Sequence, residues 1–524
     1  MGVKINELSR LTKEIADLPY DPEPWLHRGQ CLRLLGYPEL ALGDVYKARL
    51  LTEAALANTR ALSTTTTGDN ALLTFGMKIW WLHTTDPAWE KWKSMITTPE
   101  LLRSRVTDIL NKLELQVWTE LMEGLIALNA CHDYVQLSRE AVAKFPSDEI
   151  FPSELINAES WFKQRQEILQ TQYNEGEISA NLMHSTLYNG GVFPVAYPWM
   201  TEDLITRENT CFEQMQNEFK RESTNCTVSR SAIRNVHDDE ESLSQNDVFG
   251  VVATRNIALA ETVLIDRTVA GVICSIGRCA TCCSNLSGSI ANSCCTVEYC
   301  SNACAKTALE TFHPPLCRKD FTYLFDAAES AELSSDISLD SLLLLRVLAL
   351  AIHEGAAHPL NTSLLARLTP AYQIDNLIIF NFPDHIVTPI RILQELGIDV
   401  FTNSAYDTWV IHTMRCRLQN NKHGQTLDEL HGTAVNPLYS MFNHSCAPSI
   451  GWEHEGNSST LRLFAERPIM EGEELFISYI KPLDMEWAER QQALMAWLGM
   501  DCECVRCKEE RPSGNARRTL ETSV

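Results

Sequence analysis

The eighteen cysteines of this 524-residue chain are unevenly placed, and their spacing constrains the fold more than any other feature. Nine of them lie within residues 274–317. Four more come late in the chain: Cys446, Cys502, Cys504 and Cys507. In a reducing compartment, thiols two or three residues apart favour metal binding over disulfides. The other five stand alone, and we expect them to be small buried residues: Cys31, Cys131, Cys211, Cys226 and Cys416.

Length and charge set the class of protein. A chain with 45% hydrophobic residues can fill several cores, and its length suggests roughly two to four domains. It carries 44 Lys and Arg against 68 Asp and Glu, a formal charge of −24. This excess would repel nucleic-acid phosphates and could attract a basic peptide. We therefore expect a protein partner and no direct nucleic-acid partner.

Neither the start of the chain nor its most apolar segment indicates a membrane protein. The first 18 residues are amphipathic without an apolar signal core, and Asn6 breaks the myristoylation pattern. The richest apolar stretch, Ser341 to Ile352, is short and contains Arg346, so it predicts a buried helix. We expect no membrane partner and a location in the nucleus, the cytoplasm or both.

The first 160 residues have a mostly helical pattern. Residues 24–51 resemble a tetratricopeptide helix pair, in which small residues allow close contact and large ones fill the gap. The positions that carry this resemblance are Trp25, Gly29, Leu32, Ala41, Tyr46 and Ala48. Only one copy is visible, so further helices from about Ala54 to Lys144 should stack on it; a generic helical hairpin is the alternative. The polar residues 223–246 predict a linker, with a solvated acidic run at 237–247.

Residues 247–266 predict a β-hairpin, from their β-branched residues and the turn at Arg255 to Ala260. This segment resembles the opening of SET-domain lysine methyltransferases, which carry Gly-x-Gly before such a hairpin. Gly250 matches the second glycine, and Val248 stands in place of the first. In that family the backbone here passes close to S-adenosylmethionine, so Val248 would narrow the cofactor site or be absorbed by a small shift.

The cysteine block that follows resembles a MYND zinc module, with interleaved ligand pairs around two metals. The pairs are Cys279 and Cys282, Cys300 and Cys304, and His313 and Cys317. Thiolates and imidazoles at these separations can close tetrahedral zinc sites. The resemblance gives the first site Cys279, Cys282, Cys300 and Cys304. The second takes Cys294, His313 and Cys317, with Cys295 or Cys283 as the fourth ligand.

Two later motifs resemble the second half of a split SET domain. "NHSCAPS", Asn443 to Ser449, resembles Asn-His-Ser-Cys-x-Pro-Asn, and "EGEELFISYI", residues 471–480, resembles the closing strand of the family. Residues 451–469 between them predict a hairpin with its turn at 455–458. In the family the two motifs cross as a pseudoknot, and Cys446 joins the late cysteines in a post-SET zinc site: Cys446, Cys502, Cys504 and Cys507.

The resemblance assigns roles to six residues. It implies S-adenosylmethionine contacts at five positions: Phe249, Gly250, Asn421, Asn443 and His444. Tyr479 matches the active-site tyrosine, whose hydroxyl orients the lysine amine and assists near the sulfonium. Two positions depart from the family: Ser449 replaces an asparagine, and Met500 stands where an aromatic residue often stacks on adenine, a place that Trp497 could fill.

The expected fold class is α+β: a SET-domain β-fold with a pseudoknot, MYND-like and post-SET zinc modules, and all-α tetratricopeptide-like helices at the amino terminus. We divide the chain into a helical tetratricopeptide-like region (1–160), linker and helices (161–245), the first SET part (246–275), the MYND-like module (276–320), a helical insertion (321–432), the SET core (433–482), the post-SET module (483–512) and a tail (513–524).

The resemblance implies an S-adenosylmethionine-dependent protein lysine N-methyltransferase with zinc, acting on a histone or another protein. Further partner proteins would bind the helical and MYND surfaces. The alternative is a non-catalytic scaffold, favoured by Val248, Ser449, Met500 and the irregular second zinc site. The matches at Asn443, His444 and Tyr479 favour the enzyme. A zinc transcription factor is disfavoured by the acidity and the lack of a basic recognition helix.

Overall fold

The computed structural model describes residues 2–60, 99–205, 207, 209–231, 248–275, 277–286, 288–291, 294–325, 335–369, 377–498 and 500–512. The predicted acidic run at 237–247, the tail at 513–524 and part of the helices expected between 54 and 144 lie outside these ranges. The chain divides into two compact units. The first holds residues 1–192 and 379–411, and the second holds 193–378 and 412–524. Residues from the middle of the chain thus group with the amino-terminal helices.

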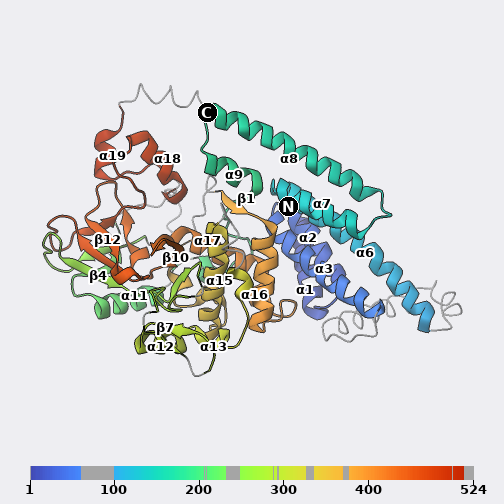
Figure 1. Ribbon diagram of the computed structural model, residues 1–524, viewed down its shortest axis with the longest axis horizontal. Coiled ribbons are helices and arrows are strands. Elements are labelled where there is room, and N and C mark those ends of the chain that lie inside the picture. The colour runs from blue at the N-terminus through green and yellow to red at the C-terminus, as the bar shows by residue number, and fades with distance from the viewer. Residues whose placement is uncertain are drawn as a thin grey trace. The chain divides into compact units, whose positions relative to one another are not determined.

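The first unit is built mainly of helices (Figure 1). They are α1 (Gly2–Asp17), α2 (Pro22–Leu35), α3 (Pro38–Arg60), α6 (Pro99–Ala127), α7 (Cys131–Lys144), α8 (Ile150–Asn174), α9 (Ala180–Tyr188), the π-helical turn η3 (Pro383–Val387), α16 (Thr388–Leu396) and the 3₁₀ turn η4 (Ser404–Tyr406). A two-stranded sheet joins β1 (Gly190–Val192) to β8 (Ile378–Phe380). Helix α17 (Thr408–Asn421) begins in this unit and ends in the other.

The helix pair α2 and α3 shows why the sequence folds locally as predicted. Asp21 caps α2 by accepting the Glu23 N–H, and Gly36, with φ of 91°, ends it. Gly29 brings the two helices close, because a Cβ there would lie 2.5 Å from Val45 Cγ2. The predicted helix pair is present; its kinship to tetratricopeptide repeats stays a prediction.

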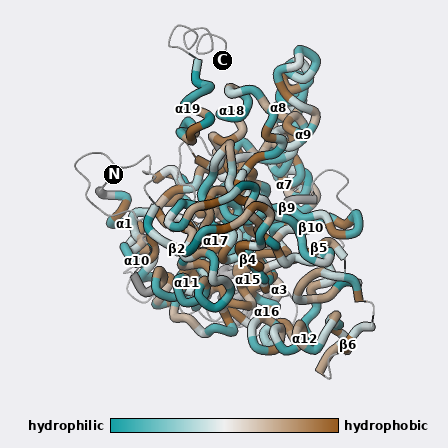
Figure 2. The backbone as a smooth tube through the Cα atoms, turned by 90° about the vertical axis from the view of Figure 1, so that its left-hand side faces the viewer, coloured by the Kyte–Doolittle hydropathy of each residue, from teal (hydrophilic) through white to brown (hydrophobic). Residues whose placement is uncertain are grey.

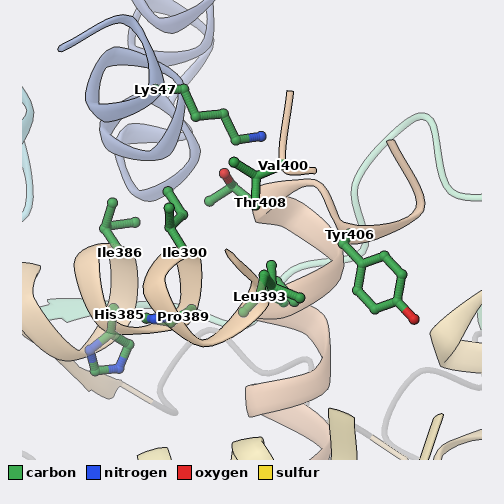
Figure 3. A pocket seen from close by; sticks show the side chains of 10 residues that line it. Lys47, His385, Ile386, Pro389, Ile390, Leu393, Val400, Tyr406 and Thr408 are labelled. Atoms are coloured by element: carbon green, nitrogen blue, oxygen red, sulfur yellow. The ribbon is translucent and has the colours of Figure 1, made fainter. Parts of the chain in front are cut away.

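Buried charges tie this pair to the segment before α17. Arg28 bonds to Asp44 (2.6 Å) and to Asp407 (2.7 Å), and Lys47 Nζ lies 2.7 Å from Asp407 Oδ1. Beside the network is a cavity of about 10 Å³, lined by six apolar side chains and by Lys47, His385, Tyr406 and Thr408. Figure 3 shows Lys47 reaching toward Val400 and Thr408, above side chains of η3 and α16. The cavity has room for about one water molecule, so it is a packing defect and no ligand site.

The second unit contains small sheets surrounded by helices. Its helices and turns are α10 (Glu202–Ile205), α11 (Asn209–Glu222), α12 (Asn302–Leu309), α13 (His313–Leu316), α15 (Ser335–Glu354), η1 (Pro359–Asn361), η2 (Leu365–Arg367), η5 (Tyr439–Met441), η6 (Glu455–Asn457), α18 (Trp487–Leu498) and α19 (Val505–Glu510). Its strands are β2 (Cys226–Arg230), β3 (Phe249–Ala253), β4 (Thr262–Asp266), β5 (Ala270–Ile273), β6 (Ile290–Ala291), β7 (Glu298–Tyr299), β9 (His423–Leu427), β10 (Leu430–Val435), β11 (Asn443–His444), β12 (Ile450–His454), β13 (Leu461–Ala465) and β14 (Glu474–Ile477).

Four sheets organise these strands, in the orders β11-β14-β3-β2, β12-β13-β4, β5-β10-β9 and β6-β7. Inward side chains of the first two sheets form one core with Phe219 of α11. In Figure 1, α12 and α13 lie on one side of the sheets and α18 and α19 on the other. Figure 2 shows hydrophobic residues gathered near β4 and α15, while α19 is mostly hydrophilic. The sheets thus hold the two cysteine-rich ends of the unit apart.

The prediction of a hairpin at 247–266 is wrong, because the two strands do not pair with each other. Strand β3 pairs with β2 and β14, whereas β4 pairs with β13 in another sheet. The connection does not turn back on itself, because Ile257 exchanges backbone hydrogen bonds with Ile469 and the Ala260 N–H donates to the Ala465 carbonyl. The hairpin predicted for 451–469 is confirmed, since β12 and β13 pair antiparallel around Glu455–Asn457.

The buried helix predicted at Ser341 to Ile352 is confirmed as part of α15. Eight of its apolar residues are buried: Leu342, Leu343, Leu344, Leu345, Val347, Leu348, Ala349 and Ala351. Arg346 donates to the Val269 and Ala280 carbonyls and lies over the Phe312 ring. Among the described helices, none combines the length and apolar character needed to cross a membrane. The five isolated cysteines are all buried, as expected.

Candidate active site and zinc centres

Strand β11 is the centre of the site, because it joins the two SET motifs. It runs parallel to β14, with Asn443 opposite Phe476 and His444 opposite Ile477. The bonding continues past the strand, where the Ser445 N–H donates to the Ile477 carbonyl. Four residues on, the Ser449 hydroxyl accepts the Phe476 N–H at 3.0 Å. Ser449 therefore bonds this segment to β14 at the position where the family has asparagine. The replacement of asparagine by serine leaves the junction closed.

Asn443 links three strands through its amide. Its Nδ2 donates to the Phe249 carbonyl (3.0 Å) and to Glu474 Oε1 (2.8 Å). Ser231 donates to the same carboxylate at 2.8 Å. Within the described residues, no hydrogen-bond donor contacts Asn443 Oδ1, so that oxygen can accept a hydrogen bond from a ligand.

Gly250 is required by space at this junction. A Cβ on Gly250 would lie 2.2 Å from Glu474 Oε1 and 3.0 Å from Asn443 Nδ2. The glycine thus lets the carboxylate and amide meet beside β3. Sequence reasoning placed Gly250 against the cofactor and missed Glu474, although Glu474 stands within the quoted "EGEELFISYI" motif. Ser231 gave no sequence signal.

His444 has both ring nitrogens engaged within the protein. Its Nδ1 accepts the Tyr479 backbone N–H at 3.0 Å, so Nε2 carries the hydrogen that faces Cys446 Sγ at 3.3 Å. The imidazole therefore positions Tyr479 and Cys446. A hydrogen bond from His444 to a cofactor would therefore come from its backbone.

Tyr479 follows β14 and is held at both ends. Its hydroxyl donates to the Phe442 carbonyl at 2.8 Å, and its ring lies 5.2 Å from His444 and 6.4 Å from Trp497. Burial raises the pKa of the Tyr479 hydroxyl above its usual range, so the phenol stays neutral at physiological pH. The oxygen keeps a lone pair that can accept an N–H from an amine.

Asp266 anchors the chain as it enters the motif. One carboxylate oxygen accepts the backbone N–H of Leu438 (2.9 Å) and of Tyr439 (2.7 Å). Burial raises the pKa of Asp266 to about 7, and the two N–H groups partly oppose that shift. Asp266 was not predicted as a site residue, because its only sequence signal is that of a lone acid at the end of an apolar strand.

Two of the predicted cofactor residues are placed differently from the others. The Phe249 ring is buried against Phe212, with the Arg207 guanidinium 4.2 Å above it, so only its backbone reaches Asn443. Asn421 ends α17, where its amide donates to the Thr369 and Arg417 carbonyls. No described contact joins Asn421 to Asn443, and its cofactor role stays a prediction.

The first predicted metal site is assembled. The sulfurs of Cys279, Cys282, Cys300 and Cys304 all lie within 4.8 Å of one another. Cys300 Sγ is 3.6 Å from both Cys282 Sγ and Cys304 Sγ. Zinc–sulfur bonds of about 2.3 Å place sulfurs about 3.8 Å apart in a tetrahedron. Ser301 caps α12 by accepting the Cys304 N–H, which fixes that ligand. The donor set fits zinc.

The second site gains Cys295 as its fourth ligand. His313 Nε2 lies 3.2 Å from Cys294 Sγ and 3.6 Å from Cys295 Sγ, and Cys317 completes the group. Tyr299 bonds to the other ring nitrogen of His313 at 3.1 Å, the contact that orients a metal-binding imidazole. Cys283, the other candidate, is buried apart from this group.

The third site joins the carboxy-terminal segment to β11. Its members lie within 4.8 Å of one another: Cys446, Cys502, Cys504 and Cys507. Helix α18 supports them, because Gln491 Nε2 donates to Cys507 Sγ at 3.2 Å and Gln491 Oε1 accepts the Cys502 N–H at 2.6 Å. Four thiolates with such donors fit a structural zinc ion.

Comparison with known proteins gives matches to the part of the chain that holds this site. The family model described as "SET domain" matches residues 248–480. A SET and MYND domain-containing protein of Dictyostelium discoideum is 36% identical over 106 residues, which cover 20% of this chain and 26% of that protein. Histone-lysine N-methyltransferase SET5 of Eremothecium gossypii is 37% identical over 98 residues, 19% of each protein. Histone-lysine N-methyltransferase ATXR2 of Arabidopsis thaliana is 39% identical over 84 residues, 16% of this chain and 17% of the relative.

The alignments thus span about a quarter or less of these curated relatives. The family model matches a longer range, which covers both SET motifs and the cysteine block between them. The pairing of β11 with β14 lies within the matched residues. On this basis residues 248–480 of the chain form a SET domain.

Proposed function

We propose that the protein is an S-adenosylmethionine-dependent protein lysine N-methyltransferase. The observation that carries the proposal is the parallel pairing of β11 with β14, which holds the Tyr479 hydroxyl against the Phe442 carbonyl. The relatives include histone-lysine N-methyltransferases, which supports the same activity.

One polar atom at the junction is available to this cofactor. Asn443 Oδ1 can accept a hydrogen bond, because within the described residues only the Nδ2 of that amide is bonded. When bound, S-adenosylmethionine supplies an electrophilic methyl group. The phenol of Tyr479 stays neutral because burial raises its pKa, so its oxygen accepts an N–H and orients the amine lone pair.

The substrate we propose is a lysine side chain of a histone or of another protein. The net charge of −24 favours the approach of a basic segment. Methyl transfer needs a neutral, aligned amine and little acid–base machinery, which agrees with a site whose titratable groups serve as positioning residues.

A non-catalytic scaffold is the second candidate, and Val248 and Met500 remain its sequence support. The departure at Ser449 supports it less, because that hydroxyl bonds to β14. The two functions differ in whether any methyl group is transferred, so one assay separates them.

The test is transfer of a radiolabelled methyl group from S-adenosylmethionine to proteins of a whole-cell lysate. Wild-type protein should label at least one protein in a form recovered as methyllysine. Tyr479→Phe should lower that labelling by ~10²-fold, the scale for losing one preorganised polar group. Equal labelling by both proteins would exclude Tyr479 from the reaction, and no labelling above a protein-free control would favour the scaffold.

A further inference from the structure

A buried arginine lies against the third zinc site. Arg490 of α18 is fully buried, although arginine is rarely found inside a protein without a partner. Its Nη2 lies 3.8 Å from Cys507 Sγ and also donates to the Glu510 carboxylate. Its Nη1 donates to the Met485 carbonyl at 2.5 Å. A buried guanidinium needs such partners, because an unpaired buried charge is strongly destabilising.

Glu510 neutralises this guanidinium only in part. Its carboxylate is shared with Arg506 of α19, whose Nε lies 2.8 Å from Glu510 Oε1. The Glu510 side chain is also 40% exposed, so water and salt screen its charge. Arg490 Nε is buried and has no hydrogen-bond partner among the residues that the structure describes. The positive charge of Arg490 therefore exceeds what the shared carboxylate supplies.

The cysteine cluster supplies further negative charge. Four thiolates around one zinc ion carry two net negative charges. Three of the four cysteines are buried: Cys446, Cys502 and Cys507. Burial strengthens the attraction between a thiolate and the guanidinium 3.8 Å away, because little water screens it. Arg490 is thus placed to compensate the charge that four thiolates leave on a zinc ion.

Arginines beside the other two clusters are bonded differently. Arg318 donates to the Cys294 carbonyl at 3.0 Å, beside the second site. Arg346 donates to the Ala280 carbonyl at 2.8 Å, beside the first. Both of these bonds go to the backbone and fix the path of the chain. Arg490 contacts a sulfur ligand, so it also acts on the charge of the metal site.

The same group of charges holds the chain that follows Tyr479. Arg506 donates to the Leu483 carbonyl at 2.7 Å and to the Cys446 carbonyl at 3.3 Å. The backbone bond of Arg490 falls two residues beyond Leu483. These bonds connect the segment after Tyr479 with the NHSC segment and with α19.

We propose that Arg490 is the counter-charge of the third zinc site, where its guanidinium stabilises the metal-bound thiolates and so keeps the segment after Tyr479 in place. It is a positioning residue, because it acts on a zinc ligand and touches no reacting group. The inference rests on the proposed function only where Tyr479 is concerned. Its test measures metal binding, so a failed transfer assay and a failed counter-charge are separate results.

The test loads the full-length protein with cadmium-113, a soft metal ion that thiolate sites accept in place of zinc. Its NMR resonance responds to the charge and hydrogen bonding of the ligands, and each cluster should give one resonance. The third-site resonance is the one absent from Cys504→Ser, and Cys300→Ser and Cys294→Ser assign the other two. Titration with EDTA then gives the concentration at which the third-site resonance is half lost.

Arg490→Met keeps an unbranched stem and removes the charge. It should shift the third-site resonance and lower its EDTA midpoint by ~10-fold, the scale for losing an outer partner of a metal ligand. Arg490→Lys keeps the charge and should recover most of that loss. Glu510→Gln should not lower the midpoint, because the contact of Arg490 with the sulfur remains. Lys508→Met removes an exposed cation of α19 and is the matched control, with no expected change.

Three outcomes would overturn the proposal. The first is a third-site resonance and midpoint that Arg490→Met leaves unmoved. The second is an equal loss in Glu510→Gln, which would make Arg490 only the ion-pair partner of Glu510. The third is a ~10-fold loss in Arg490→Lys, which would show that shape and not charge is required. This last comparison, made against wild type, decides the matter if Arg490→Met does not fold.

Discussion

At the scale of single residues, Gly250 is a position in the site where one added carbon would overlap its neighbours. Its missing Cβ is the space in which Glu474 meets Asn443, and that meeting joins β3, β11 and β14. The resemblance to the SET family gave Gly250 a role beside a cofactor. The structure adds a packing reason that holds with or without one.

Gly250→Ala should therefore lower the free energy of unfolding by about 1–3 kcal/mol, because the new methyl group overlaps the partly buried Glu474 carboxylate. Urea denaturation measures the change. Gly424→Ala is the matched control, since nothing lies within 4 Å of a Cβ built there in β9. The loss should shrink in a Glu474→Ala background, where the overlapping atom is gone; an unchanged loss would show that the overlap is not its cause.

Asp266 makes a pH dependence predictable. Its folded pKa is about 7, above the value near 3.9 of an unfolded aspartate, so the folded state holds the proton more tightly. The stability that this group contributes is present below about pH 4 and is lost as pH rises to about 7, by at most about 4 kcal/mol.

Asp266→Asn mimics the protonated carboxyl and can still accept the two backbone N–H groups. Unfolding free energies measured from pH 5 to 8 should fall with pH less steeply in this variant than in wild type. Glu509→Gln, at an exposed acid, serves as the control. Identical slopes in Asp266→Asn and wild type would contradict the buried, proton-retaining carboxyl.

At the scale of elements, the carboxy-terminal thiolates hold α18 and α19 to the NHSC segment. Three ligands surround the start of α19, and Cys446 comes from the segment after β11. The bond therefore joins parts of the chain about 60 residues apart through one metal ion. Loss of the metal ion should release α18 and α19 from the NHSC segment and leave the core of the sheets folded.

Metal analysis of purified protein should find three zinc ions per chain, one for each cluster, and Cys504→Ser should lose one. The rate of methyl transfer by this variant should fall strongly, while its melting temperature should change little. Cys274→Ser, at a cysteine outside the three clusters, should keep all three ions. Global unfolding of Cys504→Ser would contradict a local role for the third zinc site.

Comparison of sequence with structure shows which parts of this fold are encoded locally. The first and third zinc clusters were predictable, because their ligands stand in short spacings and shared motifs. The fourth ligand of the second cluster was left open between Cys295 and Cys283, since only the folded path of the chain decides it. Strands β3 and β4 were found, but not their partners, because a period-two pattern specifies faces and not neighbours.

Within the site, the same limit applies. Asn443, His444 and Tyr479 were named from motifs, and the structure brings them together through β11 and β14. Their hydrogen bonds could not be predicted: both nitrogens of His444 serve the protein itself.

At the scale of the whole molecule, the grouping of residues 379–411 with the amino-terminal helices is the feature least visible in the sequence. The buried contacts of Asp407 with Arg28 and Lys47 give it a physical basis. Each charge needs the others, because an unpaired buried charge is strongly destabilising. The insertion between the SET motifs is therefore bonded, within the first unit, to helices encoded more than 300 residues earlier.

The central claim is that the junction of β11 with β14 binds S-adenosylmethionine and presents Tyr479 to an amine. Calorimetric titration of S-adenosylmethionine into three folded proteins tests it most directly. Wild type should bind, Tyr479→Phe should bind with near wild-type affinity, and Asn443→Ala should bind more weakly, because it loses the open Oδ1 and the tie to Phe249. Thermal melting of each protein confirms folding beforehand. If wild-type protein binds no S-adenosylmethionine at millimolar concentrations, the enzyme account is contradicted and the scaffold takes its place.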